Sequence, residues 1–236
     1  MEKRTCWRNI FEGAYIGMRV LITGSSKGIG RATALKFLKE GHEVFGIDLL
    51  ESTIDDKKYH HYVADVSLAN SLPNISDVEI LFVNAGKQNS GSDITNNLVG
   101  SINTIEKYGF NDKIKSILIN ASASARSGQE FPEYVASKSG LIGYMRNVAI
   151  RLAPLGATCN ALSLGGVNTE SNKPVMEDKK LWSKIMNVTP LRKWMDEDEV
   201  ADWAYFLTVI NKSMSGEDIL VDNGEQKLNP TFIWPK

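Results

Sequence analysis

The sequence predicts an α/β protein with a doubly wound, mostly parallel sheet flanked by helices. Short apolar runs alternate along the chain with longer segments of helical spacing. The runs lack the period-two pattern of a half-exposed strand, which indicates strands buried on both faces. A glycine-rich turn joins the first run to the first helical segment.

The elements around that turn have clear boundaries. Ala32, Leu35 and Leu38 recur at helical spacing and are expected on one face of the first helix. Gly41 is expected to end this helix, because glycine readily adopts the left-handed conformation found after helices. The predicted elements are a strand at residues 20–22, a helix at 31–40 and a strand at 44–47 that ends at Asp48.

The rest of the chain continues this alternation, without an internal repeat or a second domain. Further strands are predicted at residues 61–65, 78–83, 116–120, 157–162 and 219–221. Further helices are predicted at residues 97–107, 134–152 and 196–210, with helical turns at 181–186. Asp196 or Asp198 suits the start of the last helix. Crossovers between parallel strands should be right-handed.

Composition limits the class of protein. The chain has 236 residues and a formal net charge of −1, which provides no basic field for nucleic acid or anionic lipid. No apolar stretch is long enough to span a membrane. Cys6 and Cys159 lie far apart and suit a reducing cytoplasm, where we expect the protein. His60 and His61 lack the accompanying ligand spacing of a metal site, so no metal is expected.

The chain divides into an N-terminal extension, residues 1–17, and one domain, residues 18–236. The extension has no long apolar region of the kind found in signal peptides. Either Met18 is the true start, or the extension is an arm that packs on the domain. The large apolar side chains of such an arm would be Trp7, Ile10, Phe11 and Tyr15.

The glycines follow the pattern T-G-x-x-x-G-x-G, with Gly24, Gly28 and Gly30. Glycine lets the backbone turn sharply and lets a pyrophosphate approach without meeting a Cβ atom. The helix that follows offers free N–H groups and its positive dipole end to phosphates. Asp48 lies 18 residues beyond Gly30, where a carboxylate can accept both ribose hydroxyl hydrogens. The pattern predicts a dinucleotide site; the alternative is a glycine-rich turn without a ligand.

Five motifs follow one another in order: TGSSKGIG, Asp65-Val66, VNAG, NLVG and the YVASK of residues 134–138. With them, residues 20–224 resemble the short-chain dehydrogenase/reductase family. The resemblance implies a single-domain Rossmann fold and an NAD(P)-dependent oxidoreductase that interconverts a secondary alcohol and a ketone. It also implies a homodimer or homotetramer, with the long helix after residue 134 and the last strand in the interfaces.

The same resemblance implies roles for individual residues. Tyr134 is the acid/base, Lys138 its partner, and Asn97 holds a water in the proton relay. Asp48 holds the adenosine ribose. The residues implied to bind the cofactor are Gly24, Ser26, Lys27, Gly28, Ile29, Gly30, Asp48, Asp65, Val66, Asn84, Ala85, Gly86, Gly165, Val167 and Thr169, together with Tyr134 and Lys138.

Physical chemistry supports the tyrosine–lysine pair independently of the resemblance. Tyr134 and Lys138 are four residues apart, so their side chains share one face of a helix. The phenol of tyrosine has a pKa of about 10 in model peptides, so it is a poor base at neutral pH. A nearby ammonium stabilises the phenolate and lowers the phenol pKa. The alternative is a chance exposed pair.

Two serines compete for the position that orients the substrate oxygen. Matching Gly128 to the glycine that follows the family's serine selects Ser122. Ser124 is the alternative, and Ser127 is expected to face solvent.

Two spans are shorter than is usual in the family, residues 65–84 and 84–97. One helix on a sheet face is therefore expected to be trimmed, and the helix that carries Asn97 is expected to start late. A more open substrate entrance and an altered subunit interface are the expected consequences.

Asp48 favours NAD over NADP, because its carboxylate would face a 2′-phosphate directly. Lys27 is a basic residue of the kind that NADP-using relatives often carry, but the carboxylate is expected to dominate. Two other functions stay open. A nucleotide-sugar epimerase or dehydratase shares the Tyr–Lys pair but would need a long C-terminal substrate domain. A non-catalytic NAD-binding sensor or scaffold would typically lack Tyr134, Lys138 or the serine.

Overall fold

The computed structural model describes residues 17–228, so the predicted N-terminal extension lies outside the described residues except for Gly17. Within them, seven parallel strands form one sheet in the order β3-β2-β1-β4-β5-β6-β9. The strands are β1 (Arg19–Thr23), β2 (Glu43–Asp48), β3 (Tyr59–Val63), β4 (Ile80–Val83), β5 (Ser116–Asn120), β6 (Thr158–Leu164) and β9 (Asp218–Val221). The strand order reverses direction between β1 and β4, which confirms the doubly wound fold class.

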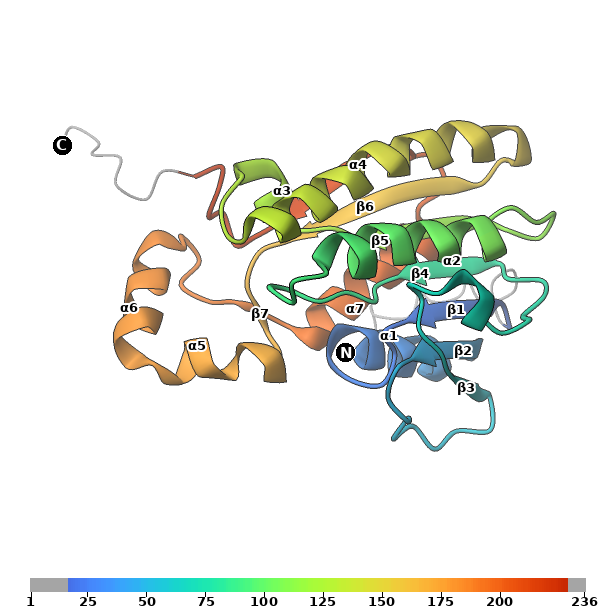
Figure 1. Ribbon diagram of the computed structural model, residues 1–236, viewed down its shortest axis with the longest axis horizontal. Helices are drawn as coiled ribbons and strands as arrows, with labels where there is room; N and C mark the ends of the chain where they lie inside the picture. The colour runs from blue at the N-terminus through green and yellow to red at the C-terminus, as the bar shows by residue number, and fades with distance from the viewer. Residues whose placement is uncertain (1–16, 229–236) are drawn as a thin grey trace, which may run out of the picture.

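Helices cover both faces of the sheet (Figure 1). The α-helices are α1 (Gly28–Lys39), α2 (Gly100–Tyr108), α3 (Ser124–Ser127), α4 (Pro132–Leu152), α5 (Lys173–Glu177), α6 (Lys179–Val188) and α7 (Glu197–Tyr205). Two π-helical turns, η2 (Ile94–Val99) and η5 (Phe206–Ile210), adjoin α2 and α7. Helices α1 and α7 pack on one face, and α2 and α4 on the other. Within residues 17–228 no helix has the length and hydropathy needed to cross a membrane.

The continuous apolar strands are explained by burial on both faces. In β1, Leu21 packs into the cluster under α2 and α4, whereas Val20 and Ile22 pack into the cluster under α1 and α7. All three side chains have no exposed surface. Because successive side chains on a strand point to opposite faces, both sides of this sheet must be apolar.

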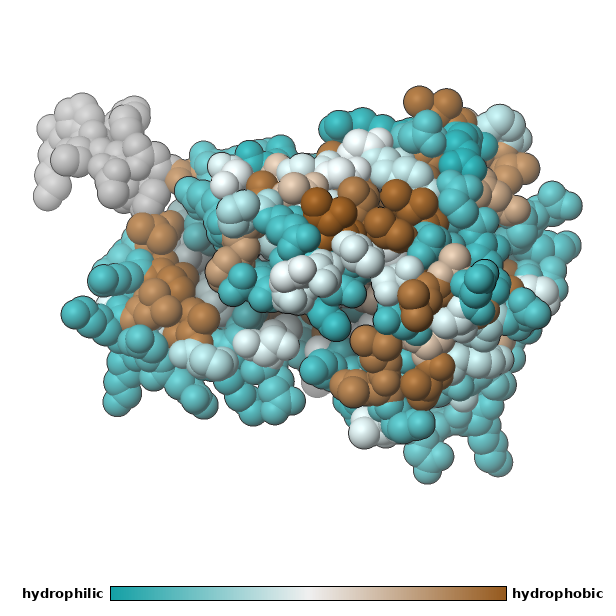
Figure 2. Space-filling model, in the orientation of Figure 1, coloured by the Kyte–Doolittle hydropathy of each residue, from teal (hydrophilic) through white to brown (hydrophobic). Residues whose placement is uncertain are grey.

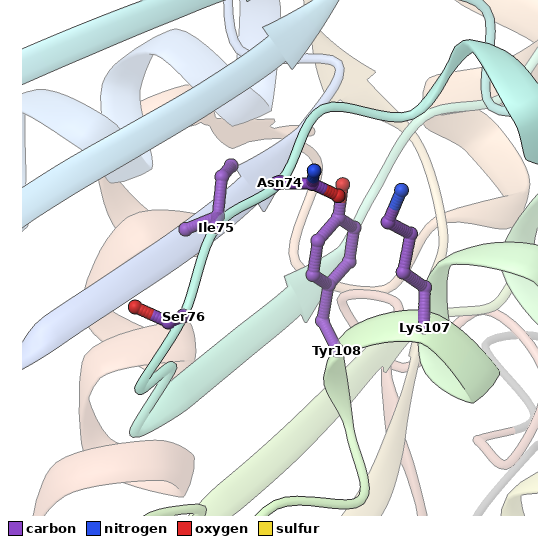
Figure 3. A pocket seen from close by; sticks show the side chains of 5 residues that line it. All are labelled: Asn74, Ile75, Ser76, Lys107 and Tyr108. Carbon is purple, nitrogen blue, oxygen red and sulfur yellow. The ribbon is translucent and has the colours of Figure 1, made fainter.

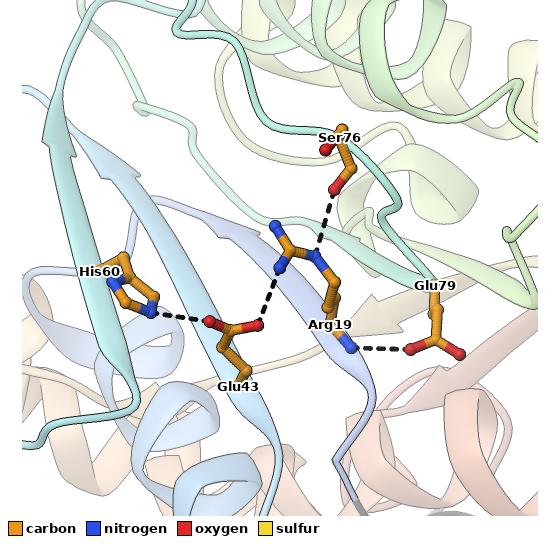
Figure 4. Close-up of polar contacts among 5 residues, drawn as sticks. All are labelled: Arg19, Glu43, His60, Ser76 and Glu79. Atoms are coloured by element: carbon orange, nitrogen blue, oxygen red, sulfur yellow. Dashed lines mark hydrogen bonds and ion pairs between the residues drawn. The ribbon is translucent and has the colours of Figure 1, made fainter.

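Charged side chains link the strands at the amino end of the sheet (Figure 4). Arg19 forms an ion pair with Glu43 at 3.0 Å, and the other carboxylate oxygen of Glu43 lies 2.9 Å from His60. The Arg19 Nε atom donates to the Ser76 carbonyl at 3.2 Å. These contacts join β1, β2 and β3 to the segment before β4, at the end of the sheet opposite the glycine turn.

The connection from β3 to β4 contains only a three-residue 3-10 turn, Ala69–Ser71, in agreement with the predicted trimmed helix. Side chains of α2 and the loop after it hydrogen-bond to carbonyls of this irregular segment instead. These donors are Asn103 to Val66 and Ser67, Lys107 to Leu72, Tyr108 to Pro73 and Asn111 to Val78. Figure 3 shows Lys107 and Tyr108 beside residues 74–76, with which they line a surface pocket.

Some predicted details were wrong. The predicted apolar face of Ala32, Leu35 and Leu38 is not the face that packs: Leu35 is 39% exposed, because α1 turns Ala34 and Phe37 toward the sheet and α7. A two-stranded sheet of β7 (Val167–Asn168) and β8 (Met195–Asp196) was not predicted, since strands this short have no sequence pattern.

The pair α5–α6 projects beyond the sheet on the side to which β6 leads (Figure 1). Helix α6 buries none of its residues, and Figure 2 shows an apolar patch over it. The predicted helical turns at residues 181–186 thus belong to a longer, strongly amphipathic helix whose apolar side is only partly covered, with Trp182 packed edge-on against Trp194.

Candidate functional site

The glycine turn closes tightly on the end of β4. Gly24 has a φ of +70°, and a Cβ atom there would lie 2.9 Å from the Ala85 Cα atom. A Cβ atom on Gly30 would collide with the Gly24 carbonyl oxygen. The Asn84 amide donates to the Thr23 and Gly24 carbonyls at 3.1 and 3.2 Å. Only glycine permits this close approach of helix, turn and strand.

The first turn of α1 fits a phosphate. Lys27 is its N-cap residue and makes no side-chain cap hydrogen bond, and no acidic residue lies in the first turn. The backbone N–H groups of Gly28, Ile29 and Gly30 therefore have no side-chain acceptor at the helix start. Such an N-terminus combines free donors with the positive end of the helix dipole.

The Asp48 carboxylate lies beside this turn and retains acceptor capacity. One oxygen accepts the Ser26 N–H at 3.0 Å, and the other accepts the Leu50 N–H at 3.0 Å. Each oxygen keeps a further lone pair. The Ser26 hydroxyl is directed to the Leu50 carbonyl at 2.9 Å. The acidic end of β2 is thus held against the glycine turn, as a ribose site requires.

Sequence reasoning missed a polar network behind this site. The Tyr59 hydroxyl lies 3.0 Å from the Ser25 Oγ atom and 3.0 Å from the His61 Nδ1 atom. The other His61 nitrogen lies 2.8 Å from the Leu50 carbonyl. A Cβ atom on Gly46 would collide with the Tyr59 and Ser25 oxygens. Gly46 was the sequence feature that could have indicated this network, since a glycine inside a strand often marks a place where other groups approach the backbone closely.

Other expected cofactor residues lie at neighbouring strand ends. Asp65 caps its own loop by accepting the Ser67 N–H at 2.8 Å, and Val66 packs where a Cβ atom on Gly100 would lie. Gly165 packs against Asp222, and Thr169 donates its N–H to the Val167 carbonyl at 2.9 Å.

Ser122 lies close enough to Tyr134 to act on its phenol, so the end of β5 and the start of α4 meet there. Burial raises the pKa of Tyr134 to about 12, with Ser122 opposing the rise and Glu130 and Asp93 adding to it. The Ser124 hydroxyl donates to the Ser122 Oγ atom at 2.7 Å. Ser122 therefore faces the tyrosine, Ser124 lies behind it, and Ser127 is exposed as expected.

Lys138 lies one helical turn beyond Tyr134 on α4. Its Nζ atom is 5.7 Å from the centre of the Tyr134 ring and donates to the Asn120 carbonyl at 2.7 Å. The side chain is 4% exposed. Burial lowers the pKa of Lys138 to about 8, and the Asp93 charge opposes this effect.

Asn97 is fully buried in the π-helical turn η2. Its Oδ1 atom accepts the Lys87 N–H at 2.7 Å, and its Nδ2 atom donates to the Lys87 carbonyl at 2.8 Å and to Ser137 at 3.0 Å. A Cβ atom on Gly86 would lie 3.0 Å from Asn97 Oδ1 and 3.6 Å from Lys138 Nζ. Isolated π-turns are frequent at functional sites, where they re-aim one side chain.

Two polar residues outside the expected set lie near the tyrosine. The Gln88 amide donates to the Glu130 carboxylate at 2.7 Å, and the charge of Glu130 acts on Tyr134. Glu130 has a φ of +80°, an unusual conformation for a residue other than glycine. Burial raises the pKa of Glu130 above its ordinary value, with Gln88 opposing and Glu225 adding to the rise. The two loops, residues 87–94 and 126–132, were expected from the sequence to determine specificity, but the pairing of Gln88 with Glu130 across them has no pattern along the chain.

Among residues 17–228 no group of three or more histidine, cysteine, aspartate or glutamate side chains is placed to hold a metal ion. The free helix N-terminus of α1, the Asp48 carboxylate and the Tyr134–Lys138 pair lie along one edge of the sheet.

Comparisons with known proteins agree with this geometry. A family model described as enoyl-(acyl carrier protein) reductase matches residues 97–226. The glucose 1-dehydrogenase of Gluconobacter oxydans is 26% identical, over 91% of this chain and 94% of the relative. The L-rhamnose 1-dehydrogenase (NADP(+)) of Thermoplasma acidophilum is 29% identical, over 88% of this chain and 96% of the relative.

A solved structure has the same fold. The ligand-free aldohexose dehydrogenase of Thermoplasma acidophilum has a TM-score of 0.82 and 24% identity, covering 94% of this chain and 98% of that chain. The matched family model spans more than half of the chain, including the segment with Asn97, Ser122, Tyr134 and Lys138. The chain belongs to the short-chain dehydrogenase/reductase family of NAD(P)-dependent oxidoreductases.

Proposed function

We propose that this oxidoreductase oxidises a small secondary alcohol to a ketone, reversibly, with Tyr134 as acid/base and NAD as preferred cofactor. The observation that carries the proposal is the position of Lys138 one helical turn from Tyr134, with its Nζ atom 5.7 Å from the centre of the phenol ring, and the influence of Ser122 on the same phenol. A non-catalytic nucleotide sensor would have no need for this buried pairing of hydroxyl, phenol and ammonium.

A nicotinamide cofactor held by the residues at the strand ends would supply the hydride chemistry. Tyr134 as phenolate takes the hydroxyl proton of the alcohol, and in the reverse direction it returns that proton to the oxygen. The Ser122 hydroxyl donates a hydrogen bond to the same oxygen and fixes its position. Lys138 stabilises the phenolate, and Asn97 holds a water through which the proton reaches solvent.

The cofactor roles follow the strand ends. Gly24, Gly28 and Gly30 with the start of α1 hold the pyrophosphate, and Asp48 holds the adenosine ribose. Asp65 and Val66 border the adenine. Residues of the segments 84–86 and 165–169 line the path to the nicotinamide end. NAD is preferred because the Asp48 carboxylate would repel a 2′-phosphate at close range, although the Thermoplasma rhamnose dehydrogenase is NADP-dependent by name.

We propose a neutral, polyhydroxylated substrate, such as an aldose or a cyclic polyol. The support is the Gln88–Glu130 pair near Tyr134, which offers amide and carboxylate groups for further hydroxyls. Two relatives are named as glucose and rhamnose dehydrogenases. The negative charges of Glu130 and Glu225 disfavour an anionic substrate at this position.

The test measures NADH absorbance with a panel of aldoses, cyclic alcohols and 3-hydroxyacyl thioesters. Tyr134→Phe should lower kcat by about 10²- to 10⁴-fold, because it removes the general acid/base. NADH binding, followed by fluorescence, should stay within about twofold, since the phenyl ring keeps the packing. Unchanged turnover in Tyr134→Phe would rule out the proposed role, and preference for acyl thioesters would rule out the proposed substrate class.

We also propose a cytoplasmic homodimer or homotetramer with α4 and β9 in its interfaces. An interface at α4 is supported by an exposed apolar side chain on its outer face, since Ile150 is 73% exposed. We propose in addition that the chain from residue 18 onward forms a single functional domain. The support is that one sheet and its helices contain every proposed site residue.

A further inference from the structure

A fully buried carboxylate, Asp93, lies immediately before the π-helical turn that carries Asn97. Buried aspartates are rare unless hydrogen bonds or charges compensate for the lost hydration. Asp93 is four residues before Asn97, so the two side chains leave neighbouring turns of the same helical segment. None of the roles above uses Asp93.

The Asp93 carboxylate holds the turn that precedes it. One oxygen accepts the Asn89 N–H at 2.8 Å, and the other accepts the Ser90 N–H at 2.9 Å and the Ser90 hydroxyl at 2.6 Å. The same loop presents the Lys87 peptide to Asn97, which bonds to both its N–H and its carbonyl group. The position of Lys87, and through it that of Asn97, therefore depends on the turn that Asp93 holds.

Asp93 is also the acid whose charge acts on Lys138. The Lys138 ammonium is buried and donates to a neutral carbonyl, that of Asn120. No ion pair joins Lys138 to a carboxylate within residues 17–228 at 4.0 Å or less. The charges that act on Tyr134 are those of Glu130 and Asp93.

Asp93 is ionised at neutral pH. Burial alone would raise its pKa, but hydrogen bonds from Ser90 and Asn89 and the charge of Lys138 together hold the pKa below its ordinary value. The carboxylate is thus a negative charge that acts on both members of the catalytic pair.

We propose that Asp93 is a positioning residue of the catalytic centre, which holds the loop of residues 87–90 against Asn97 and supplies the negative charge that Lys138 faces. The inference rests on the oxidoreductase mechanism proposed above. A negative charge favours the ammonium form of Lys138 and disfavours the phenolate form of Tyr134, so it raises the pKa of both groups. The two groups titrate as a coupled pair, and both apparent pKa values should fall when the charge is removed.

The experiment compares pH profiles of kcat/KM for alcohol oxidation in the wild type and in Asp93→Asn. The neutral variant should shift the profile to lower pH by about one unit, the usual size of the effect of one nearby charge. Asp93→Glu, which restores the charge, should return the midpoints toward wild-type values. Asp112→Asn is the matched control, because it removes an exposed carboxylate at the opposite end of β5 and should shift nothing. A loss of kcat at every pH with unmoved midpoints would reduce Asp93 to a structural residue and overturn the charge role.

A second measurement does not depend on turnover. NMR of protein labelled with ¹³C at lysine Cε follows the titration of Lys138, whose signal is assigned by its absence in Lys138→Met. The Lys138 midpoint should be lower in Asp93→Asn than in the wild type, and an unchanged midpoint would overturn the inference. Asp93→Ser is a second neutral variant, small enough to keep a hydrogen bond to the turn if Asp93→Asn does not fold. A lowered midpoint in a protein that oxidises no alcohol would support the placement of the charge while refuting the proposed function.

Discussion

Tyr134 is subject to opposing influences at the residue scale. Burial and the charges of Glu130 and Asp93 raise its pKa to about 12, and Ser122 opposes the rise. Alcohol oxidation near neutral pH therefore requires positive charge beside the phenol. Lys138 supplies one such charge from the same helix face, although burial brings its own pKa down to about 8. The pair can work only while the ammonium stays protonated.

The two neighbouring serines should differ in their effect on turnover. Ser122→Ala removes the hydroxyl that meets Tyr134, and kcat/KM should fall by about 10²- to 10³-fold, as for other oxyanion-type donors. Ser124→Ala removes only a donor to Ser122, so the loss should be at most about tenfold, the value of one ordinary hydrogen bond. Steady-state kinetics of both variants checks this order. A larger loss in Ser124→Ala would assign the substrate contact to Ser124.

At the scale of elements, α2 replaces the missing helix between β3 and β4. Three residues of α2, Asn103, Lys107 and Tyr108, and Asn111 in the loop after it donate side-chain hydrogen bonds to carbonyls of the connection between β3 and β4. Buried carbonyl groups need partners, and an irregular segment cannot supply them from its own backbone. At the start of α7 the carboxylates of Asp196 and Glu199 form a capping box that accepts backbone N–H groups, which selects Asp196 over Asp198 as the cap.

Tyr108→Phe should destabilise the protein by about 0.5–1.5 kcal/mol, the net value of one hydrogen bond. The ring stays buried, but the Pro73 carbonyl loses the donor that lies 2.6 Å away. Urea unfolding measures the free-energy difference. Tyr205→Phe is the matched control, because within residues 17–228 its hydroxyl has no hydrogen-bond partner, and it should change stability by less than about 0.5 kcal/mol. Equal effects of the two variants would mean that the Tyr108 hydroxyl does not stabilise the connection.

At the scale of the whole molecule, all proposed cofactor contacts lie at the carboxyl ends of the parallel strands. The glycine turn follows β1, Asp48 ends β2, and residues 84–86 follow β4. This edge is where an open parallel sheet gathers loops and helix N-termini, so a single long ligand can contact several strands. Binding such a ligand should stabilise the entire fold, because the contacts span the sheet from β2 to β6.

NADH at about 100 times its Kd should stabilise the protein by about 2.7 kcal/mol, which raises Tm by about 5–10 °C in a chain of this size. NADPH at the same concentration should raise Tm by less than half as much, because of the Asp48 carboxylate. Asp48→Asn should reduce this difference, whereas Asp55→Asn, which removes a nearby exposed carboxylate, should not. Differential scanning fluorimetry gives both shifts. A greater shift with NADPH would reverse the proposed preference.

The sequence by itself determined the order of strands and helices, the glycine turn and the family motifs. These features are local. An apolar run, a glycine or a pair of residues four apart can be interpreted from a single segment of the chain. The short span before β4 likewise predicted the trimmed helix. The sequence did not predict the two-residue strands or the exposure of Leu35, because both depend on packing against other elements.

Only the tertiary structure decided which serine meets Tyr134, what holds Asn97 in place and which acids surround the pair. Ser122, Asp93 and Glu130 come from three different loops, and no pattern along the chain relates them. Their effect on Tyr134 is electrostatic and depends on distance and burial, which exist only once the loops have been brought together at the end of the sheet.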